Sequence, residues 1–268
     1  MIGAIVGDIV GSRFEWNNIK TKDFELFTPK CRPTDDSIMT LALAQAILKS
    51  QPDGSDLSKN AVTWMQALGR NYPDAGYGGI FHHWIFSRVP QPYNSFGNGA
   101  AMRVSPAGFA ASSLEEAKEL ARKVTEVTHN HPEGIKAAEA TASAIYLART
   151  GKSLSELRKF IHENYYPMDF TLDEIRDSYR FDVTCQGSVP QAFMAFFAST
   201  SFEDAIRNAI SIGGDSDTIA AICGGIAEAY YGVPDAIRER ALTFLDARLT
   251  QILTAFESKY PPVTEKAR

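Results

Sequence analysis

Two short acidic motifs contain the residue types that best suit a divalent metal ion. They read Thr34-Asp35-Asp36-Ser37 and, much later in the chain, Gly213-Gly214-Asp215-Ser216-Asp217-Thr218. Carboxylate and hydroxyl oxygens, with no cysteine or clustered histidine among them, favour Mg²⁺ or Mn²⁺ over zinc or copper. Four carboxylates gathered in one place would repel each other. Two divalent ions about 3.5–4 Å apart would remove that repulsion and polarise a water molecule between them.

Each motif is also compatible with an ordinary helix start. Thr34 fits an N-cap followed by two acids in the first helical turn, where the helix dipole favours negative charge. Asp215 and Asp217 likewise follow a glycine pair and precede an apolar segment. Because both starts combine paired carboxylates with a threonine hydroxyl, we expect them to face each other across one cleft.

Histidines and glycine-rich turns are weaker candidates for a binding site. His129 is equally compatible with a packed core position and with a stacking, hydrogen-bonding role in a pocket, and no third soft ligand stands at a zinc spacing from it. His82-His83 is interpreted as structural. Segments 76–79 and 97–99 are either tight turns or loops whose amides reach a bound anion. No dinucleotide, P-loop or nucleophile-elbow motif occurs in the sequence.

Apolar periodicity predicts that helices position these motifs. Residues 2–10 carry an apolar stripe at helical spacing, and glycine repeats every fourth residue from Gly3 to Gly11, which leaves one face smooth for a neighbour. Further stripes span 57–68, 114–127, 219–230 and 242–256, and capping boxes pair Ser113 with Glu116, Ser153 with Glu156 and Thr171 with Glu174. We therefore predict an all-α fold of ten or more helices, with loops at 12–33, 70–79, 89–106, 129–134 and 163–190.

Length and composition indicate one soluble domain. The chain has 268 residues, 44% hydrophobic and 22% charged, and no linker or repeat divides it, so residues 1–268 are predicted to form a single domain. A formal net charge of −5 argues against nucleic acid as a main partner. Three scattered cysteines, without a signal peptide or a spanning segment, predict a cytoplasmic location and no membrane partner.

Five motifs, in the same order, resemble the ADP-ribosylglycohydrolase family, which is related to the dinitrogenase-reductase-activating glycohydrolase. They are Gly3-Ala4-Ile5-Val6-Gly7-Asp8 with Gly11-Ser12-Arg13-Phe14-Glu15, Thr34-Asp35-Asp36-Ser37, Gly97-Asn98-Gly99-Ala100-Ala101-Met102-Arg103, Thr128-His129, and Gly213-Gly214-Asp215-Ser216-Asp217-Thr218. Each motif is weak alone, but their order along most of the chain is specific. The compact all-α fold of the family agrees with the periodicity.

The resemblance implies a binuclear centre of two Mg²⁺ (or Mn²⁺) ions. Glu15 matches a glutamate that in some members reaches the metals and gates the cleft. Ser37 departs from the family pattern, because many members have threonine there. The residues that match the two ligand groups are Thr34, Asp35 and Asp36, then Asp215, Asp217 and Thr218, and those that match the ADP-ribose pocket are Asn98, Gly99 and His129.

By the same resemblance, the protein is expected to hydrolyse the bond between C1″ of the distal ribose of ADP-ribose and a modified group. The reaction would pass through an oxocarbenium-like state, with Glu15 and Asp36 as the two candidate general bases. The expected substrate is an ADP-ribosylated protein or a small ADP-ribose conjugate. Two alternatives are a hydrolase of another small ADP-ribose conjugate or nucleotide, and a catalytically silent ADP-ribose-binding module.

An arginine linkage is favoured over a serine linkage by the loop 71–77. A guanidinium leaving group can pair with a carboxylate through two hydrogen bonds and can stack on aromatic rings. Asp74 lies between Tyr72 and Tyr77 in this loop and offers both. Asp74 is also compatible with a plain β-turn after Pro73.

Overall fold

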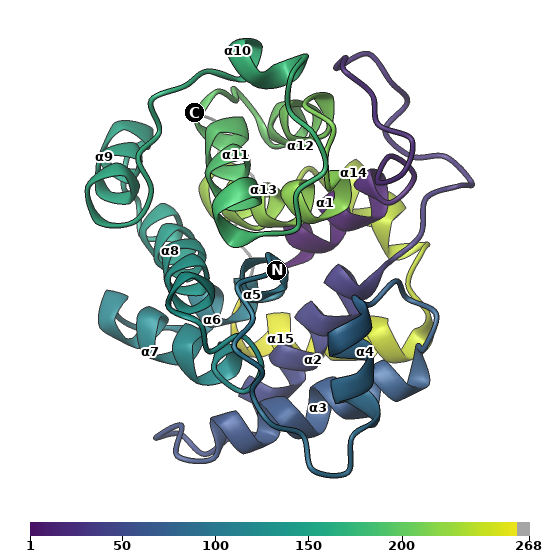
Figure 1. The fold of residues 1–268 in the computed structure, drawn as a ribbon, viewed down its shortest axis with the longest axis vertical. Helices are drawn as coiled ribbons and strands as arrows, with labels where there is room; N and C mark the ends of the chain where they lie inside the picture. Colours follow the sequence, from purple (N-terminus) through teal and green to yellow (C-terminus); the bar gives the residue numbers. More distant parts are fainter. Residues whose placement is uncertain (262–268) are drawn as a thin grey trace.

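The N-terminal apolar stripe forms α1 (Ile2–Gly11), which lies against α13 (Ser216–Tyr231) in the middle of the molecule (Figure 1). A computed structural model describes residues 1–261, in which there are fifteen α-helices and no strand. The predicted all-α fold is therefore confirmed, and residues 262–268 of the predicted domain lie outside the described part of the chain. Among the described residues, no helix has the length and apolar character needed to span a membrane.

The other thirteen helices of residues 1–261 surround this central pair (Figure 1). In chain order they are α2 (Asp35–Lys49), α3 (Leu57–Asn71), α4 (Gly79–Phe86), α5 (Gly99–Met102), α6 (Ser105–Ala110), α7 (Leu114–Thr125), α8 (Pro132–Arg149), α9 (Leu154–Asn164), α10 (Leu172–Arg176), α11 (Cys185–Phe197), α12 (Phe202–Ser211), α14 (Asp235–Leu242) and α15 (Ala247–Lys259). The pair formed by α2 and α3 lies on one side, and α11 and α12 both pack on α13. The start of α13 thus lies on the central pair, and α2 packs on α1 beside it.

The glycine repeat of α1 forms the contact with α13. A Cβ atom built on Gly7 would lie 2.0 Å from the backbone oxygen of Ala220, and one on Gly11 would lie 2.5 Å from Cα of Asp217. Such distances are well inside van der Waals contact, so only glycine allows the two backbones to come this close. The close approach brings the end of α1 next to the second acidic motif.

We expect Gly7→Ala to lower the free energy of unfolding by about 3 kcal/mol or more, because the added methyl group must push two buried helices apart. Urea unfolding followed by far-UV circular dichroism measures the change. Gly78→Ala is the matched control, since its Cβ would meet no atom within 4 Å and its φ of −57° suits alanine. Equal stability of the two variants would contradict the packing described for α1.

The structure corrects the prediction at two helix starts. The stripe at 242–256 is divided between α14 and α15, because the Asp246 carboxylate accepts a hydrogen bond from the Leu249 amide (2.9 Å) and begins a new helix. At α7, Ser113 caps the Glu116 amide, but the Glu116 carboxylate accepts from Ser112 instead of Ser113, so this capping box is incomplete. The other two capping boxes are complete, as predicted.

Two predicted loops contain helices. The segment 163–190 includes α10, and α11 begins within it at Cys185 and continues through Pro190. The segment 89–106 includes α5 and the start of α6. An isolated bridge between Gly97 and Thr184, flanked by a hydrogen bond from the Asn98 amide to the Val183 carbonyl (2.7 Å), ties these two segments together. The bridge therefore fixes the glycine-rich turn 97–99 against the start of α11.

Candidate active site

The two acidic motifs meet at neighbouring helix starts, as their residues predicted. Thr34 is the N-cap of α2, and its hydroxyl accepts a hydrogen bond from the Asp36 amide (3.4 Å). The hydroxyl of Thr218, in the first turn of α13, donates to Oδ2 of Asp36 (3.3 Å), which joins the two motifs directly. The cap of α2 and the convergence of the two motifs are therefore both realised, whereas Asp215 at the N-cap of α13 makes no side-chain cap hydrogen bond.

Carboxylate oxygens gather there in two overlapping groups. Atoms of Asp8, Asp36 and Asp217 all lie within 4.8 Å of one another, and so do atoms of Glu15, Asp215 and Asp217. Asp217 belongs to both groups. The geometry resembles two adjacent cation sites that share one carboxylate, and each group supplies only oxygen ligands.

Burial and mutual repulsion raise the pKa values of these acids. Burial raises the pKa of Asp36 and Asp217 well above the usual range, and the neighbouring carboxylates raise it further. The pKa of Glu15 is raised to about 7 by burial and by Asp215, and that of Asp35 to about 7 by burial and by Asp8. The cluster therefore resists full ionisation unless positive charge is supplied.

The donor set fits hard divalent cations. Oδ1 of Asp36 is buried without a hydrogen-bond partner. Within residues 1–261, no ion pair involves any carboxylate of the two groups, Asp8, Glu15, Asp36, Asp215 and Asp217. Buried charges are normally paired or bound to a metal, and an all-oxygen set suits Mg²⁺ or Mn²⁺.

Asp8 is a site residue that was not predicted. Its Oδ2 accepts hydrogen bonds from the amides of Thr34 (2.9 Å) and Ser37 (3.0 Å), and the hydroxyls of both residues also donate to its carboxylate. Asp8 therefore anchors the start of α2 to α1 and sets the position of Asp36. The signal in the sequence was a lone acid inside the apolar stripe of residues 2–10.

Asn18 fastens the segment that carries Glu15 to the second motif. Its side-chain amide donates to the carbonyls of Phe14 (2.7 Å) and Gly214 (2.9 Å), and its Oδ1 accepts from the Gly214 amide (2.7 Å). Gly213 and Gly214 have φ of +68° and +77°, a conformation that glycine adopts without strain. These bonds place Glu15 and Asp215 beside each other.

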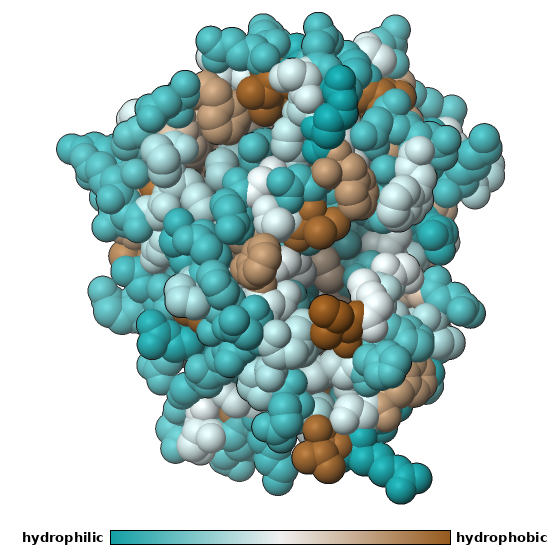
Figure 2. All heavy atoms as spheres, in the orientation of Figure 1, coloured by the Kyte–Doolittle hydropathy of each residue, from teal (hydrophilic) through white to brown (hydrophobic). Residues whose placement is uncertain are grey.

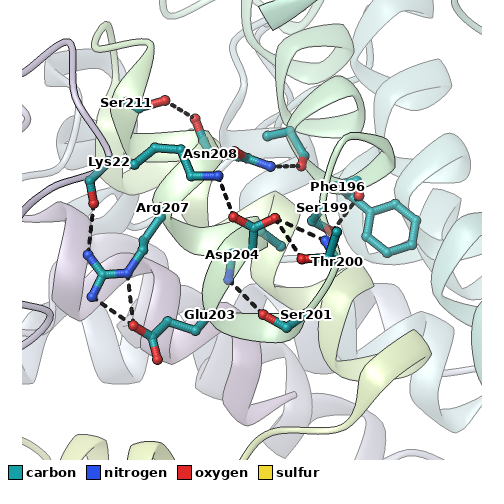
Figure 3. Close-up of polar contacts among 12 residues, drawn as sticks. Lys22, Phe196, Ser199, Thr200, Ser201, Glu203, Asp204, Arg207, Asn208 and Ser211 are labelled. Carbon is teal, nitrogen blue, oxygen red and sulfur yellow. Dashed lines mark hydrogen bonds and ion pairs between the residues drawn. The ribbon is translucent and has the colours of Figure 1, made fainter. Parts of the chain in front are cut away.

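The same segment is held further along by α12 (Figure 3). Lys22 forms an ion pair with Asp204, and the Arg207 guanidinium donates to the Lys22 carbonyl (2.9 Å). The same guanidinium donates to the Phe24 carbonyl (2.7 Å). Arg207 is itself oriented by Glu203 at 2.7 Å. The loop 12–33 is thus anchored at three positions that follow Glu15, namely Asn18, Lys22 and Phe24.

A cavity of about 490 Å³ opens over the carboxylates. Its rim includes exposed apolar side chains: Trp16 is 74% exposed and stacks on Phe181 with ring centroids 5.0 Å apart, and Ile80 is 68% exposed. Apolar residues are visible in the middle of this face of the molecule (Figure 2). The cavity is lined by Glu15, Trp16, Asp35, Asp36, Gly76, Tyr77, Gly78, Gly79, Ile80, Phe81, Tyr93, Ser95, Gly97, Asn98, Gly99, Met102, Arg103, His129, Phe181, Val183, Asp215, Asp217 and Thr218.

The predicted pocket residues Asn98, Gly99 and His129 line this cavity. The Asn98 side chain donates to Oδ2 of Asp215 (2.7 Å) and to the Ser188 hydroxyl (3.1 Å), so it also orients a carboxylate of the site. His129 is only 5% exposed and lies beside Gly99. His129 is therefore both packed and part of the pocket, which unites the two interpretations of this residue.

Two predicted residues lie outside the lining. Thr34 is buried beneath it, where its hydroxyl contacts Asp8 and Asp36. Asp74 is exposed in the turn before Ala75 and is not among the lining residues. His82 and His83 are exposed on α4 and are not among the lining residues.

The helical fold and its carboxylate-lined cavity define the class of protein. A sequence model of the ADP-ribosylglycohydrolase family matches residues 1–261, and the chain therefore belongs to this family. It is an enzyme that hydrolyses the bond joining ADP-ribose to another group. A solved structure described as an ADP-ribosylglycohydrolase-related protein complex has the same fold, with a TM-score of 0.65 and 24% identity over 97% of this chain and 95% of that one.

Among its relatives, ADP-ribosylhydrolase ARH3 of Homo sapiens is 27% identical, with 87% of this chain and 84% of the relative covered. The ADP-ribosyl-[dinitrogen reductase] glycohydrolase of Rhodospirillum rubrum is 27% identical over 75% of this chain and 70% of the relative. The ADP-ribosylarginine hydrolase Tri1 of Pseudomonas putida is 26% identical over 87% of this chain and 70% of the relative. Two of these relatives are thus named for what they act on, one for ADP-ribosylated dinitrogen reductase and the other for ADP-ribosylarginine.

Proposed function

We propose that this ADP-ribosylglycohydrolase acts with two divalent ions, Mg²⁺ or Mn²⁺, held by the two carboxylate groups that share Asp217. The observation that carries the proposal is this overlap of buried oxygen ligands, with Asp36 on one side and Asp215 on the other. Thr34 and Thr218 support the ligands through hydrogen bonds to Asp36. When bound, the ions supply positive charge that orients the ribose hydroxyls and lowers the pKa of a water molecule.

The chain's own residues then set up the attack on C1″ of the distal ribose. Asn98 keeps Asp215 oriented, and His129 and Gly99 form the wall against which ADP-ribose lies. Glu15 and Asp36 remain the two candidate general bases, since both line the cavity and either can accept the proton of the attacking water. The surrounding carboxylates stabilise the positive charge that develops on the ribose ring.

An arginine-linked ADP-ribosyl protein is the substrate we propose. The relative from Pseudomonas putida is named as an ADP-ribosylarginine hydrolase, and the relative from Rhodospirillum rubrum is named for a modified protein. Asp74 stands on the same loop as Tyr77, which lines the cavity, so an acceptor protein approaching the mouth would meet its carboxylate. A guanidinium leaving group can pair with such a carboxylate.

The comparison that tests this substrate is release of ADP-ribose from arginine-linked and serine-linked peptides at matched concentrations. We expect wild type to cleave the arginine linkage faster, and Asp74→Ala to reduce that rate by about 5- to 10-fold, because a rim ion pair contributes about 1 kcal/mol. The serine linkage should be cleaved at a nearly unchanged rate. Asp53→Ala, which removes an acid from another exposed turn, is the control.

Faster cleavage of the serine linkage, or equal loss of both activities in Asp74→Ala, would overturn the assignment of arginine. The proposed metal site would survive that result. Titration of free ADP-ribose into the same samples separates a loss of pocket binding from a loss of acceptor recognition. Binding without release from any conjugate would contradict the enzymatic function itself.

A further inference from the structure

The guanidinium of Arg103 is buried in the wall of the cavity, apart from every ion pair described for residues 1–261. Arg103 is 1% exposed, and its guanidinium carbon lies 4.8 Å from the centre of the Phe81 ring. One terminal nitrogen contacts Nδ1 of His129 and the hydroxyl of Thr128, both at 2.8 Å. Burying a cation costs free energy unless its hydrogen bonds are satisfied, and Arg103 directs one of these bonds at His129.

The contact with Arg103 determines which imidazole nitrogen carries the proton. A guanidinium has only donors and stays protonated, so Nδ1 of His129 must accept the hydrogen bond with its lone pair. The Thr128 hydroxyl lies 2.9 Å from the same nitrogen and also contacts the Thr125 carbonyl at 3.3 Å. A neutral imidazole that accepts at Nδ1 carries its proton at Nε2.

His129 lines the cavity, and within residues 1–261 the hydrogen bonds of its imidazole ring all involve Nδ1, which leaves the Nε2 atom for a ligand. The Nε2 atom lies beside the glycine turn, 3.2 Å from the position of a Cβ built on Gly99 and 3.6 Å from one built on Gly97. A side chain at Gly99 would crowd the ring, whereas one at Gly97 would make an ordinary contact with it, so the absence of a side chain at Gly99 leaves room around this nitrogen. Burial and the adjacent Arg103 both lower the pKa of His129 well below its usual range, which agrees with a neutral ring.

We propose that Arg103 is a positioning residue that holds His129 as the neutral tautomer protonated at Nε2, so that His129 donates one hydrogen bond to an acceptor oxygen of ADP-ribose. The proposal rests on the proposed function only for the identity of the ligand. His129 then takes no part in proton transfer, and acid–base work is left to the carboxylates. This division of roles explains why a histidine can line the cavity beside acids that compete for protons.

The tautomer can be measured directly on the wild-type enzyme. Long-range ¹H–¹⁵N spectra of protein labelled at histidine nitrogens distinguish protonated from unprotonated ring nitrogens, and His129→Gln identifies the signals of His129. We expect Nδ1 to be unprotonated and Nε2 to be protonated at neutral pH. A proton on Nδ1, or a ring protonated at both nitrogens, would overturn the proposal. This readout requires neither metal nor substrate, so it is independent of the proposed function.

Binding of free ADP-ribose tests the donor role of Nε2. His129→Leu removes the donor, and we expect a 10-fold or greater rise in Kd, whereas His129→Gln keeps an N–H near the same place and should lose clearly less affinity. Equal losses in the two variants would show that Nε2 donates nothing to the ligand. Arg103→Met should let His129 populate both tautomers in the nitrogen spectrum, and an unchanged spectrum in the folded variant would contradict the role of Arg103.

Discussion

Asp36→Asn and Asp217→Asn are expected to lower the turnover number by about two orders of magnitude or more, because each removes a charged ligand from the site that positions the ribose and the water. Stability should respond differently. Burial and neighbouring acids raise the pKa of both residues, so the native state holds their protons more tightly than the unfolded chain does. Ionisation therefore costs stability as pH rises above the unfolded pKa, and asparagine removes that cost.

The free energy of unfolding of both variants, without divalent ions, should therefore equal or exceed that of wild type. If the acids only stabilised the helix N-termini, the opposite pattern would appear. The variants would then lose up to about 1 kcal/mol in free energy of unfolding and would keep the wild-type turnover number. Glu115→Gln is the matched control, because Glu115 holds the same position after the N-cap of α7 that Asp36 holds after the N-cap of α2, but it is exposed. Its turnover should equal that of wild type.

Removing divalent ions is expected to abolish activity while the helices remain. Of the proposed ion ligands, Asp36, Asp215 and Asp217 stand at the starts of α2 and α13, Asp8 lies in α1 and Glu15 in the loop 12–33. The core that holds these helices consists of apolar residues elsewhere along them. Readdition of Mg²⁺ or Mn²⁺ should restore activity and raise Tm. At a free ion concentration 100 times Kd, one site adds about 2.7 kcal/mol to the free energy of unfolding.

Chelation followed by elemental analysis, circular dichroism and an activity assay on the same sample measures each part of this expectation. Full activity in protein that contains no divalent metal would refute the proposed ion dependence. Loss of the far-UV signal on chelation would instead assign the ions a structural role. The variant Asp217→Asn should show a smaller rise in Tm with Mg²⁺ than wild type, because Asp217 belongs to both carboxylate groups.

Local patterns in the sequence were sufficient to predict most of the helices of the fold. Helix periodicity and N-caps depend on neighbouring residues, so the starts at Thr34, Ser153 and Thr171 could be predicted. The stripe at 242–256 wrongly predicted one helix, because its apolar spacing continues across the turn at which Asp246 begins α15. The predicted loop 163–190 extends too far, because α11 begins at Cys185 and includes Pro190.

The convergence of the two acidic motifs could be predicted from the sequence, but the distant residues that position them could not. In the sequence, Asp8 is a single acid within an apolar helix. Only the folded chain brings the amides of Thr34 and Ser37 to its carboxylate. Asn18 contacts Gly214 across 196 positions of sequence, a pairing that no local pattern encodes. The capping interpretation is confirmed for Thr34 at the start of α2, whereas Asp215 makes no side-chain cap at the start of α13, and metal binding by both motifs stays a prediction.

The most direct test of the central claim is mass-spectrometric identification of the products formed from an arginine-ADP-ribosylated protein and Mg²⁺. Cleavage at C1″ predicts intact ADP-ribose in solution and an unmodified arginine on the acceptor, both formed by wild type and Glu115→Gln and nearly absent with Asp217→Asn. A phosphoribosyl group left on the arginine with AMP in solution, or release by Asp217→Asn at the wild-type rate, would contradict glycosidic hydrolysis at this site.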